Sequence, residues 1–98
     1  MKKNNFSINY TSKYEREFRK ISKKDKNLAR KILVVSDLLS LDPYSPKLET
    51  HIVNTSYGAR TYTSRVSGDI RILWRFEDGN IILLLTVGGH SGSSKVYK

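Results

Sequence analysis

Apolar and polar residues alternate with a period of two near the start of the chain and again through its C-terminal half. Residues 6–10, 60–66 and 70–76 show this alternation, which is typical of strands with one buried face. Residues 81–87 are apolar at both parities, as expected of a central strand covered on both sides. Asp78-Gly79 is a strong signal for a tight hairpin turn before that strand.

The alternation also assigns side chains to faces. In the first of the two middle strands, one face would carry Tyr62, Ser64 and Val66, and the other Thr61, Thr63 and Arg65. In the next strand, one face would carry Ile70, Ile72, Trp74 and Phe76, and the other Arg71, Leu73 and Arg75.

Between the first predicted strand and the others, apolar residues recur with the period of an α-helix. Two apolar stripes would face the core: Tyr14, Phe18 and Ile21, then Leu28, Ile32, Val35 and Leu39. Residues 12–15 fit a capping box that begins with Ser12, Asp25 is a plausible second N-cap, and Asp42-Pro43 ends the pattern. We therefore predict a helical hairpin over residues 12–41.

Residues 42–59 contain two prolines and a glycine with little periodicity, and we interpret them as a loop that crosses the molecule. The predicted order is β-α-α-β-β-β. It indicates a single α+β domain over residues 1–98, with a four-stranded, mostly antiparallel sheet and the helical hairpin on one face.

Composition narrows the class of protein. The chain has 98 residues and no cysteine, which excludes disulfides and thiolate metal sites and fits a reducing cytoplasm. Its apolar runs are far shorter than the about 20 residues of a membrane span, and no apolar stretch follows Lys2 and Lys3 as in a secretory signal. We expect a cytoplasmic protein with no membrane contact, metal or cofactor.

The net charge of +9 is unevenly distributed. Residues 1–31 hold 11 Lys/Arg against 3 Asp/Glu, and residues 32–98 hold 7 against 6. A basic half of this kind favours a nucleic acid or an acidic protein as partner, with a solvated helix face as the alternative. The candidate RNA-binding residues in the hairpin are Lys20, Lys23, Lys24, Lys26, Arg30 and Lys31.

Four segments together resemble a known family: Leu48–His51, Ser64–Trp74, Gly88–His90 and Val96–Tyr97. The Arg-Val-Ser-Gly-Asp-x-Arg hairpin, the Gly-His ending and the order of elements are similar to those of the RelE/ParE superfamily of type II toxins. One branch of that superfamily contains ribosome-dependent mRNA interferases. Another contains DNA gyrase inhibitors built on the same scaffold, so the resemblance leaves both activities open.

Within the nuclease branch, the chain looks closest to YafQ-like and RelE/StbE-type members. For a YafQ-like site, the resemblance implies His51 as the loop histidine, Asp69 as the aspartate and His90 as the late histidine, while Arg65 stands where a strand histidine is found. For a RelE-like site it implies Arg71 as the first arginine and Tyr97 as the tyrosine. The RelE-type strand-lysine positions fall near Tyr62 and Ser64, and His90-Ser91 replaces the second arginine.

Metal-free cleavage of RNA needs a base for the 2′-OH, a cation for the phosphorane charge and an acid for the leaving oxygen. His90 follows two glycines and is the first candidate for acid/base work, with His51 as a possible general base. Asp69 could orient His90, or it could make the local backbone hydrogen bonds that aspartate commonly makes in a turn. Tyr97 could stack on a base or donate a proton, or pack as a terminal aromatic.

Arg71 and Arg65 are the candidate phosphate-binding residues, because a guanidinium is a permanently charged fork that matches phosphate oxygens. The alternative for Arg71 is a surface position, or an ion pair with Asp69 or Glu77.

Three functions follow from these residues. The first is a ribosome-dependent endoribonuclease whose hairpin binds rRNA and whose sheet holds mRNA. The second is a ParE-like gyrase inhibitor without nuclease activity, and the third is an inactive relative that binds only antitoxin. All three imply a cognate antitoxin, for which an acidic, partly disordered segment is a sensible counterpart.

Overall fold

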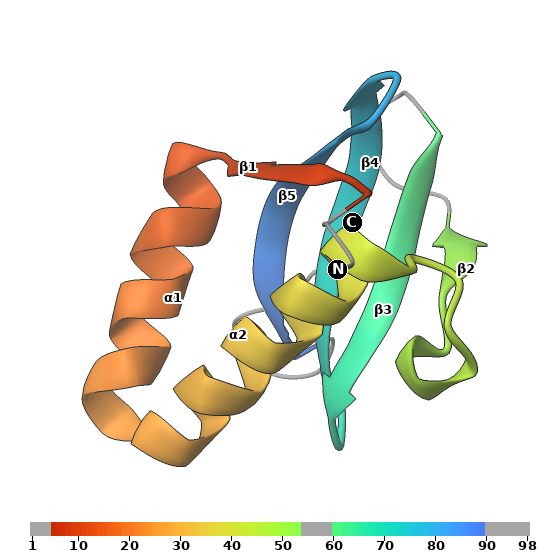
Figure 1. Ribbon diagram of the computed structural model, residues 1–98. Helices are drawn as coiled ribbons and strands as arrows, with labels where there is room; N and C mark the ends of the chain where they lie inside the picture. Colours follow the sequence, from red (N-terminus) through yellow and green to blue (C-terminus); the bar gives the residue numbers. More distant parts are fainter. Residues whose placement is uncertain (1–4, 54–59, 90–98) are drawn as a thin grey trace.

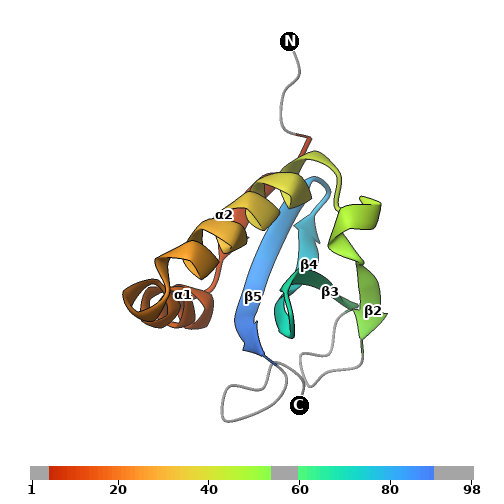
Figure 2. The ribbon, with the colours of Figure 1, turned by 90° about the horizontal axis from the view of Figure 1, so that it is seen from below.

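The computed structural model describes residues 5–53 and 60–89. They form one mixed sheet with two helices packed on one of its faces (Figures 1 and 2). The α+β class and the helical hairpin on one face are as predicted. None of the helices in these residues is long and apolar enough to cross a membrane.

The described sheet has five strands, where four were predicted. The strands are β1 (Ser7–Tyr10), β2 (His51–Val53), β3 (Thr61–Ser67), β4 (Ile70–Asp78) and β5 (Ile81–Gly89). Their order is β1-β5-β4-β3-β2, with β1 parallel to β5 and the other neighbours antiparallel. β5 is thus an interior strand, in agreement with its apolar residues at both parities.

The prediction of a loop over residues 42–59 is wrong in two places. Pro46–Leu48 form a short 3-10 helix, η1, and His51–Val53 form the edge strand β2. Three residues are too few to show an alternating pattern, so nothing in the sequence distinguished β2 from a loop. His51 therefore lies on a strand, paired with Thr63 of β3, rather than in a loop.

The helices are α1 (Ser12–Lys24) and α2 (Lys26–Leu41). The N-cap of α1 is Thr11, whose hydroxyl accepts from the Tyr14 N–H, so the capping box expected at Ser12 was one residue late. Asp25 caps α2 as predicted, because its carboxylate accepts from the Leu28 N–H at 3.0 Å.

The helix-covered face of the sheet holds the main core. Both predicted helical stripes pack there against Ile72, Trp74, Ile82 and Leu84. Trp74 is 0% exposed, stacks on Tyr62 with ring centroids 4.7 Å apart, and donates from Nε1 to Ser64 Oγ at 2.9 Å. The two faces of β3 and β4 are therefore divided as the alternation predicted.

We call the opposite face of the sheet the distal face. It carries His51, Val53, Thr61, Thr63, Arg65, Arg71, Leu73 and Arg75, which alternate with the core residues of the same strands. Its apolar part is a smaller cluster of Leu73 and Leu85, with Val53 and Leu83 packed against it.

Candidate functional site

Two adjacent rows of paired residues cross the distal face. In the first row, His51 pairs with Thr63, Thr63 with Leu73, and Leu73 with Thr86. In the second row, Arg65 pairs with Arg71, which in turn pairs with Gly88. Paired residues share a face of the sheet, so the structure brings His51, Arg65 and Arg71 to one surface.

Arg65 and Arg71 stand directly opposite each other on antiparallel strands. Like charges at such positions destabilise a sheet, by an amount comparable to the roughly 0.2–1 kcal/mol of a favourable pair. The Arg65 guanidinium has an ion pair with the Glu49 carboxylate at 3.1 Å. Arg71 is half-buried, and its Nε is buried without a hydrogen-bond partner among residues 5–53 and 60–89. The pair thus places two guanidinium groups together on the distal face, and only that of Arg65 has an ion pair within the described residues.

Glu49 connects the first row to the second. Its φ and ψ of 49° and 46° are in the left-handed region, which is uncommon for a glutamate. Its carbonyl oxygen lies 3.1 Å from His51 Nδ1, and its carboxylate contacts Arg65. A carbonyl can only accept, so Nδ1 carries the hydrogen, and a neutral His51 ring then has Nε2 free of a proton. That is the tautomer a general base requires.

Asp69 lies in the β3–β4 turn, after Gly68, whose φ of +53° favours glycine. A Cβ placed on Gly89 would lie 3.5 Å from Asp69 Oδ2, so this carboxylate is beside the end of β5. His90 and Tyr97 lie outside the described residues. The orientation of His90 by Asp69 therefore stays a prediction.

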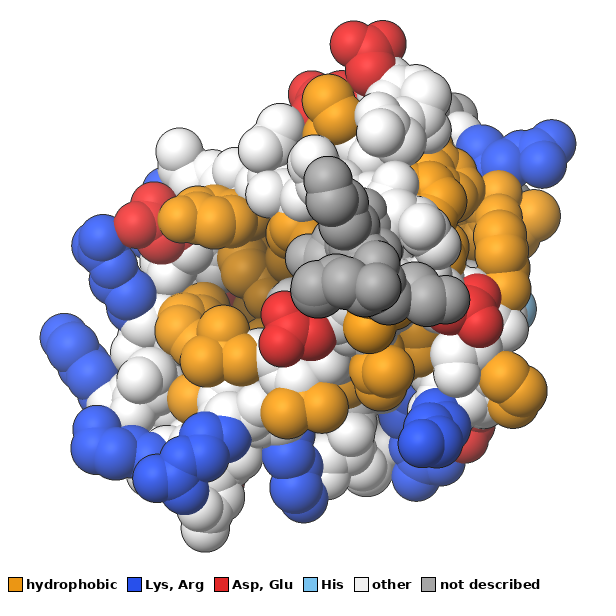
Figure 3. Space-filling model, viewed as in Figure 1, with side chains coloured by type: hydrophobic (Ala, Val, Ile, Leu, Met, Phe, Trp, Pro, Cys, Tyr) orange, Lys and Arg blue, Asp and Glu red, His pale blue; other side chains and the backbone are white. Residues whose placement is uncertain are grey.

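The six candidate RNA-binding cations are all exposed. They lie on α1 and α2 close to the turn that joins these helices, and Lys and Arg side chains gather along the lower edge of the molecule in Figure 3. Lys31 Nζ lies 3.5 Å from Ser67 Oγ, which places α2 beside the β3–β4 hairpin. The cations are thus at the same end of the sheet as the Arg65–Arg71 row (Figure 1).

Tyr62 and Ser64 cannot stand in for the RelE-type strand lysines. Both are buried on the helix-covered face, where Ser64 Oγ accepts from Trp74 and lies 2.6 Å from Thr50 Oγ1. Because successive residues of a strand lie on opposite faces, neither shares a face with Arg65. The residues of β3 that share the distal face with Arg65 are Thr61 and Thr63.

Sequence reasoning did not single out Glu49 and Thr63, which the structure places beside the candidate residues His51 and Arg65. The alternation had already placed Thr63 on the same face as Arg65, and that was the available signal. Glu49 lies in the Leu48–His51 segment that carried the resemblance, but its contacts could not be predicted, because they depend on the turn after η1 and on a strand that was not predicted. Within residues 5–53 and 60–89, no three His, Asp or Glu side chains are grouped as metal ligands would be.

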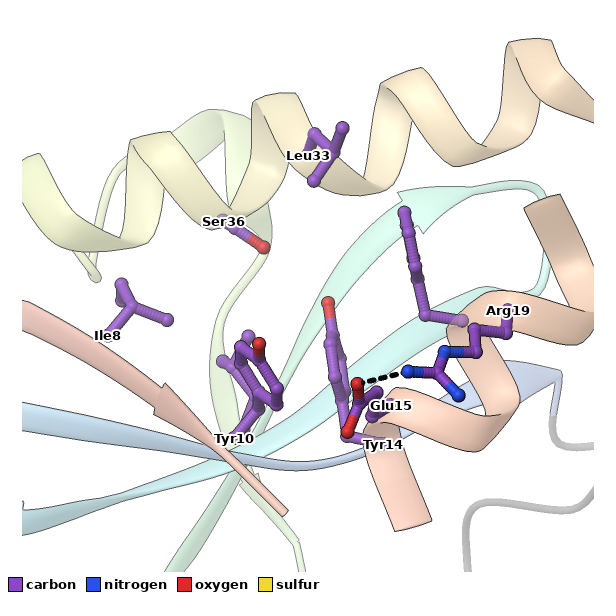
Figure 4. Close-up of a pocket in the computed structure, with 9 residues that line it drawn as sticks. Ile8, Tyr10, Tyr14, Glu15, Arg19, Leu33 and Ser36 are labelled. Atoms are coloured by element: carbon purple, nitrogen blue, oxygen red, sulfur yellow. Dashed lines mark hydrogen bonds and ion pairs between the residues drawn. The ribbon is translucent and has the colours of Figure 1, made fainter. Parts of the chain in front are cut away.

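A groove opens on the other side of the molecule, between β1, α1 and α2 (Figure 4). It has a volume of about 490 Å³ and is lined mainly by apolar and aromatic side chains: Ile8, Tyr10, Tyr14, Phe18, Leu33 and Leu84. Tyr10 and Leu33 are 56% and 55% exposed. An ion pair between Glu15 and Arg19, at 2.7 Å, lies at its rim.

No protein-family model matches the sequence, and a search of curated proteins found no match. Solved structures do match. A chain of the archaeal RelE–RelB complex from Pyrococcus horikoshii OT3 aligns with a TM-score of 0.71 at 15% identity, over 91% of this chain and 99% of that one. A YoeB/ParE toxin from Agrobacterium tumefaciens aligns with a TM-score of 0.75 at 10% identity, over 88% of this chain and 100% of that one. A chain of the YoeB–YefM complex from Staphylococcus aureus aligns with a TM-score of 0.70 at 13% identity, over 88% of this chain and 98% of that one.

Proposed function

We propose that this chain, which has the fold of the RelE/ParE-superfamily toxins, is the toxin of a type II toxin–antitoxin system. We propose further that it is an endoribonuclease, which cleaves mRNA on the ribosome without a metal. The observation that carries this second step is the Arg65–Arg71 pair on the distal face, where Arg71 Nε is buried and has no partner in the part of the chain that the structure describes. Such a pair suits a phosphodiester, whose oxygens accept hydrogen bonds and carry negative charge.

The chemistry is an attack of the ribose 2′-oxygen on the adjacent phosphorus. His51 Nε2 takes the 2′-OH proton, since Nδ1 is held by the Glu49 carbonyl. Arg71 and Arg65 stabilise the additional negative charge that develops on the phosphate oxygens. The bond from phosphorus to the 5′-oxygen then breaks, and an acid protonates that oxygen. His90 is our candidate for this acid, with Tyr97 as the alternative.

The cations of the helical hairpin are proposed to bind rRNA. They are exposed, and each phosphate that a lysine or arginine neutralises releases counterions. Ribosome binding should therefore weaken steeply as salt rises. Lys31, which contacts Ser67, would bring the rRNA contact close to the mRNA site.

An antitoxin is the proposed protein partner, and the groove between β1, α1 and α2 is its proposed anchor. Exposed Tyr10 and Leu33 offer apolar surface, and α1 and α2, the two helices that border the groove, carry the exposed cations. An acidic segment with an apolar face would match both properties. Two of the structures similar to this chain are named as RelE–RelB and YoeB–YefM complexes.

The test is primer extension on a reporter mRNA in a reconstituted translation system, with and without ribosomes and at two salt concentrations. Wild type should cut within codons only when ribosomes are present, and less at the higher salt. Arg71→Ala should reduce the cleavage rate by roughly 100-fold or more, the effect of removing one donor to a developing oxyanion. Arg75→Ala is the matched control, because Arg75 is on the same strand and face but outside the Arg65–Arg71 row.

Intact mRNA with normal translation would overturn the nuclease proposal. A DNA supercoiling assay would then decide between a gyrase-directed toxin and a chain that only binds antitoxin. Equal losses of activity in Arg71→Ala and Arg75→Ala would show a general charge effect instead of a defined phosphate site.

A further inference from the structure

Among the described residues, two buried side-chain nitrogen or oxygen atoms have no hydrogen-bond partner: Thr63 Oγ1 and Arg71 Nε. Both belong to the distal face and to neighbouring strands. Thr63 is two residues before Arg65, the partner of Arg71, so Thr63 and Arg71 are diagonal neighbours. Such neighbours are roughly 7–8 Å apart in an antiparallel pair. The two residues that carry the unpartnered atoms are therefore neighbours on the distal face.

Thr86 is a buried threonine of this sheet whose hydroxyl has a hydrogen-bond partner. Thr63 and Thr86 flank Leu73 in the same row, and both are 0% exposed. The Thr86 hydroxyl donates to the Glu17 carboxylate, which also accepts from the Val87 N–H at 3.0 Å. Thr86 lies at an irregularity of β5, from which its hydroxyl reaches α1, whereas the equally buried hydroxyl of Thr63 has no partner among the described residues.

An unsatisfied buried polar group costs about 1–3 kcal/mol, and native proteins contain few of them. Valine would fill the position of Thr63 with the same shape and without that cost. A hydroxyl retained there, one diagonal away from an unpartnered guanidinium N–H, indicates a ligand that the two groups share. Arginine can only donate, and a hydroxyl can donate, so the matching ligand is rich in acceptors and negatively charged.

We propose that Thr63 is a substrate-binding residue whose hydroxyl donates to a non-bridging oxygen of the phosphate that Arg71 holds. The identity of that phosphate as an RNA phosphodiester rests on the proposed function, whereas the anionic class of ligand rests on the two atoms alone. Because Thr63 is 0% exposed, binding requires neighbouring side chains to move, and the long side chains of Arg65 and Arg71 have the rotatable bonds to do so.

The first measurement is thermal unfolding of Thr63→Val, Thr63→Ser and Thr86→Val. Thr63→Val should unfold at the same temperature as wild type or higher, because it removes an unsatisfied hydroxyl and keeps the shape. Thr86→Val should unfold several degrees lower, because it removes a bond to a carboxylate and leaves Glu17 short of a donor. A loss of stability in Thr63→Val equal to that in Thr86→Val would overturn the proposal.

The second measurement is an NMR titration that follows the Arg71 Nε–Hε signal. The two probes are inorganic phosphate and a 2′-O-methylated RNA trinucleotide that cannot be cleaved. Thr63→Val should bind each probe roughly tenfold or more weakly, the size of one hydrogen bond to a charged group. Thr63→Ser, which keeps the hydroxyl, should bind as wild type does, and Thr86→Val should leave affinity unchanged.

Wild-type affinity in Thr63→Val would overturn the proposal whether or not the protein cleaves RNA. If wild type failed to cleave mRNA but lost phosphate binding in Thr63→Val, the nuclease function would fall and the anion site would stand. If wild type cleaved mRNA and Thr63→Val cleaved equally fast, the function would stand and the role of Thr63 would fall.

Discussion

The two faces of the sheet differ in how completely their polar groups are paired. On the helix-covered face, Trp74 stacks on Tyr62 and donates to Ser64, so burial and hydrogen bonding agree. On the distal face, two arginines stand opposite each other, and two buried polar atoms lack partners among the residues that the structure describes. Both faces are built from the same strands, so the difference arises from alternate residues of one sequence.

This difference in pairing distinguishes the residues of the helix-covered face, which stabilise the fold, from polar residues of the distal face, which lower its stability. Like charges in register and an unsatisfied hydroxyl are each unfavourable, and apolar substitutes would fit the strands equally well. Natural sequences tend to break local rules where a site requires it. These costs are a reason, separate from the resemblance, for proposing the distal face as the functional surface.

The largest expected effect is on the helix-covered face. Trp74→Ala should lower the free energy of unfolding by about 3–5 kcal/mol, the usual loss for a large buried aromatic residue. Trp74 is 0% exposed and contacts Tyr62 and Phe76, so a cavity would form at the centre of the aromatic cluster. Urea denaturation followed by circular dichroism would measure the loss.

Leu73→Ala is the comparison for this change, because Leu73 is the adjacent residue, is equally buried, and belongs to the smaller distal cluster. Its loss should be smaller, at about 2–3 kcal/mol, near the lower end of the range for leucine. Equal losses at the two positions would break the comparison, since both faces would then contribute alike to stability.

A sharper test uses two adjacent residues of β3. Ser64→Ala removes the acceptor of Trp74 Nε1 and should lower the free energy of unfolding by about 1–3 kcal/mol. Thr63→Val, one residue away on the other face, should not lower the free energy of unfolding. Denaturation of both variants under the same conditions would show the contrast. A Ser64→Ala protein as stable as wild type would mean that water replaces the hydroxyl, and that the helix-covered face is less dry than its burial indicates.

The division into faces could be predicted because alternation is a direct consequence of strand geometry. Trp74 and Arg71 were assigned to opposite faces from sequence alone, and the structure confirms both. The hairpin of helices was predictable for the same reason, since its stripes at Tyr14 and Ile32 follow the helical period. The N-cap was misplaced because Thr11 and Ser12 are both good capping residues and propensity does not choose between neighbours.

The pairing of polar groups could not be predicted, because it depends on register and on contacts distant in sequence. Thr63 and Thr86 look alike in the sequence, yet the second has Glu17 of α1 as its partner, across 69 positions of the chain. The ion pair of Arg65 depends on Glu49, which follows a short helix that the sequence did not reveal. Site residues were therefore easier to place on a face than to assign a role.

The smallest effect concerns water exclusion on the helix-covered side, and it depends on pH. Tyr14 is 6% exposed, and burial raises the pKa of its hydroxyl above 10.0, with a hydrogen bond to Ser36 acting in the opposite direction. The folded protein then holds this proton to a higher pH than the unfolded chain does. Its contribution to stability is complete below the unfolded pKa and is lost as pH rises through the folded value.

Wild type should accordingly lose more stability than Tyr14→Phe between about pH 9 and pH 11, a range around the usual tyrosine pKa. Urea denaturation at several pH values would measure the difference. The pKa of Tyr44 is also raised and that of Tyr62 is lowered, each mainly by the hydrogen bond between them, but both residues are present in the two proteins and cancel in the comparison. Parallel curves for wild type and Tyr14→Phe would show that water reaches the Tyr14 hydroxyl. The groove that Tyr14 lines would then be wetter than an apolar anchor for an antitoxin segment should be.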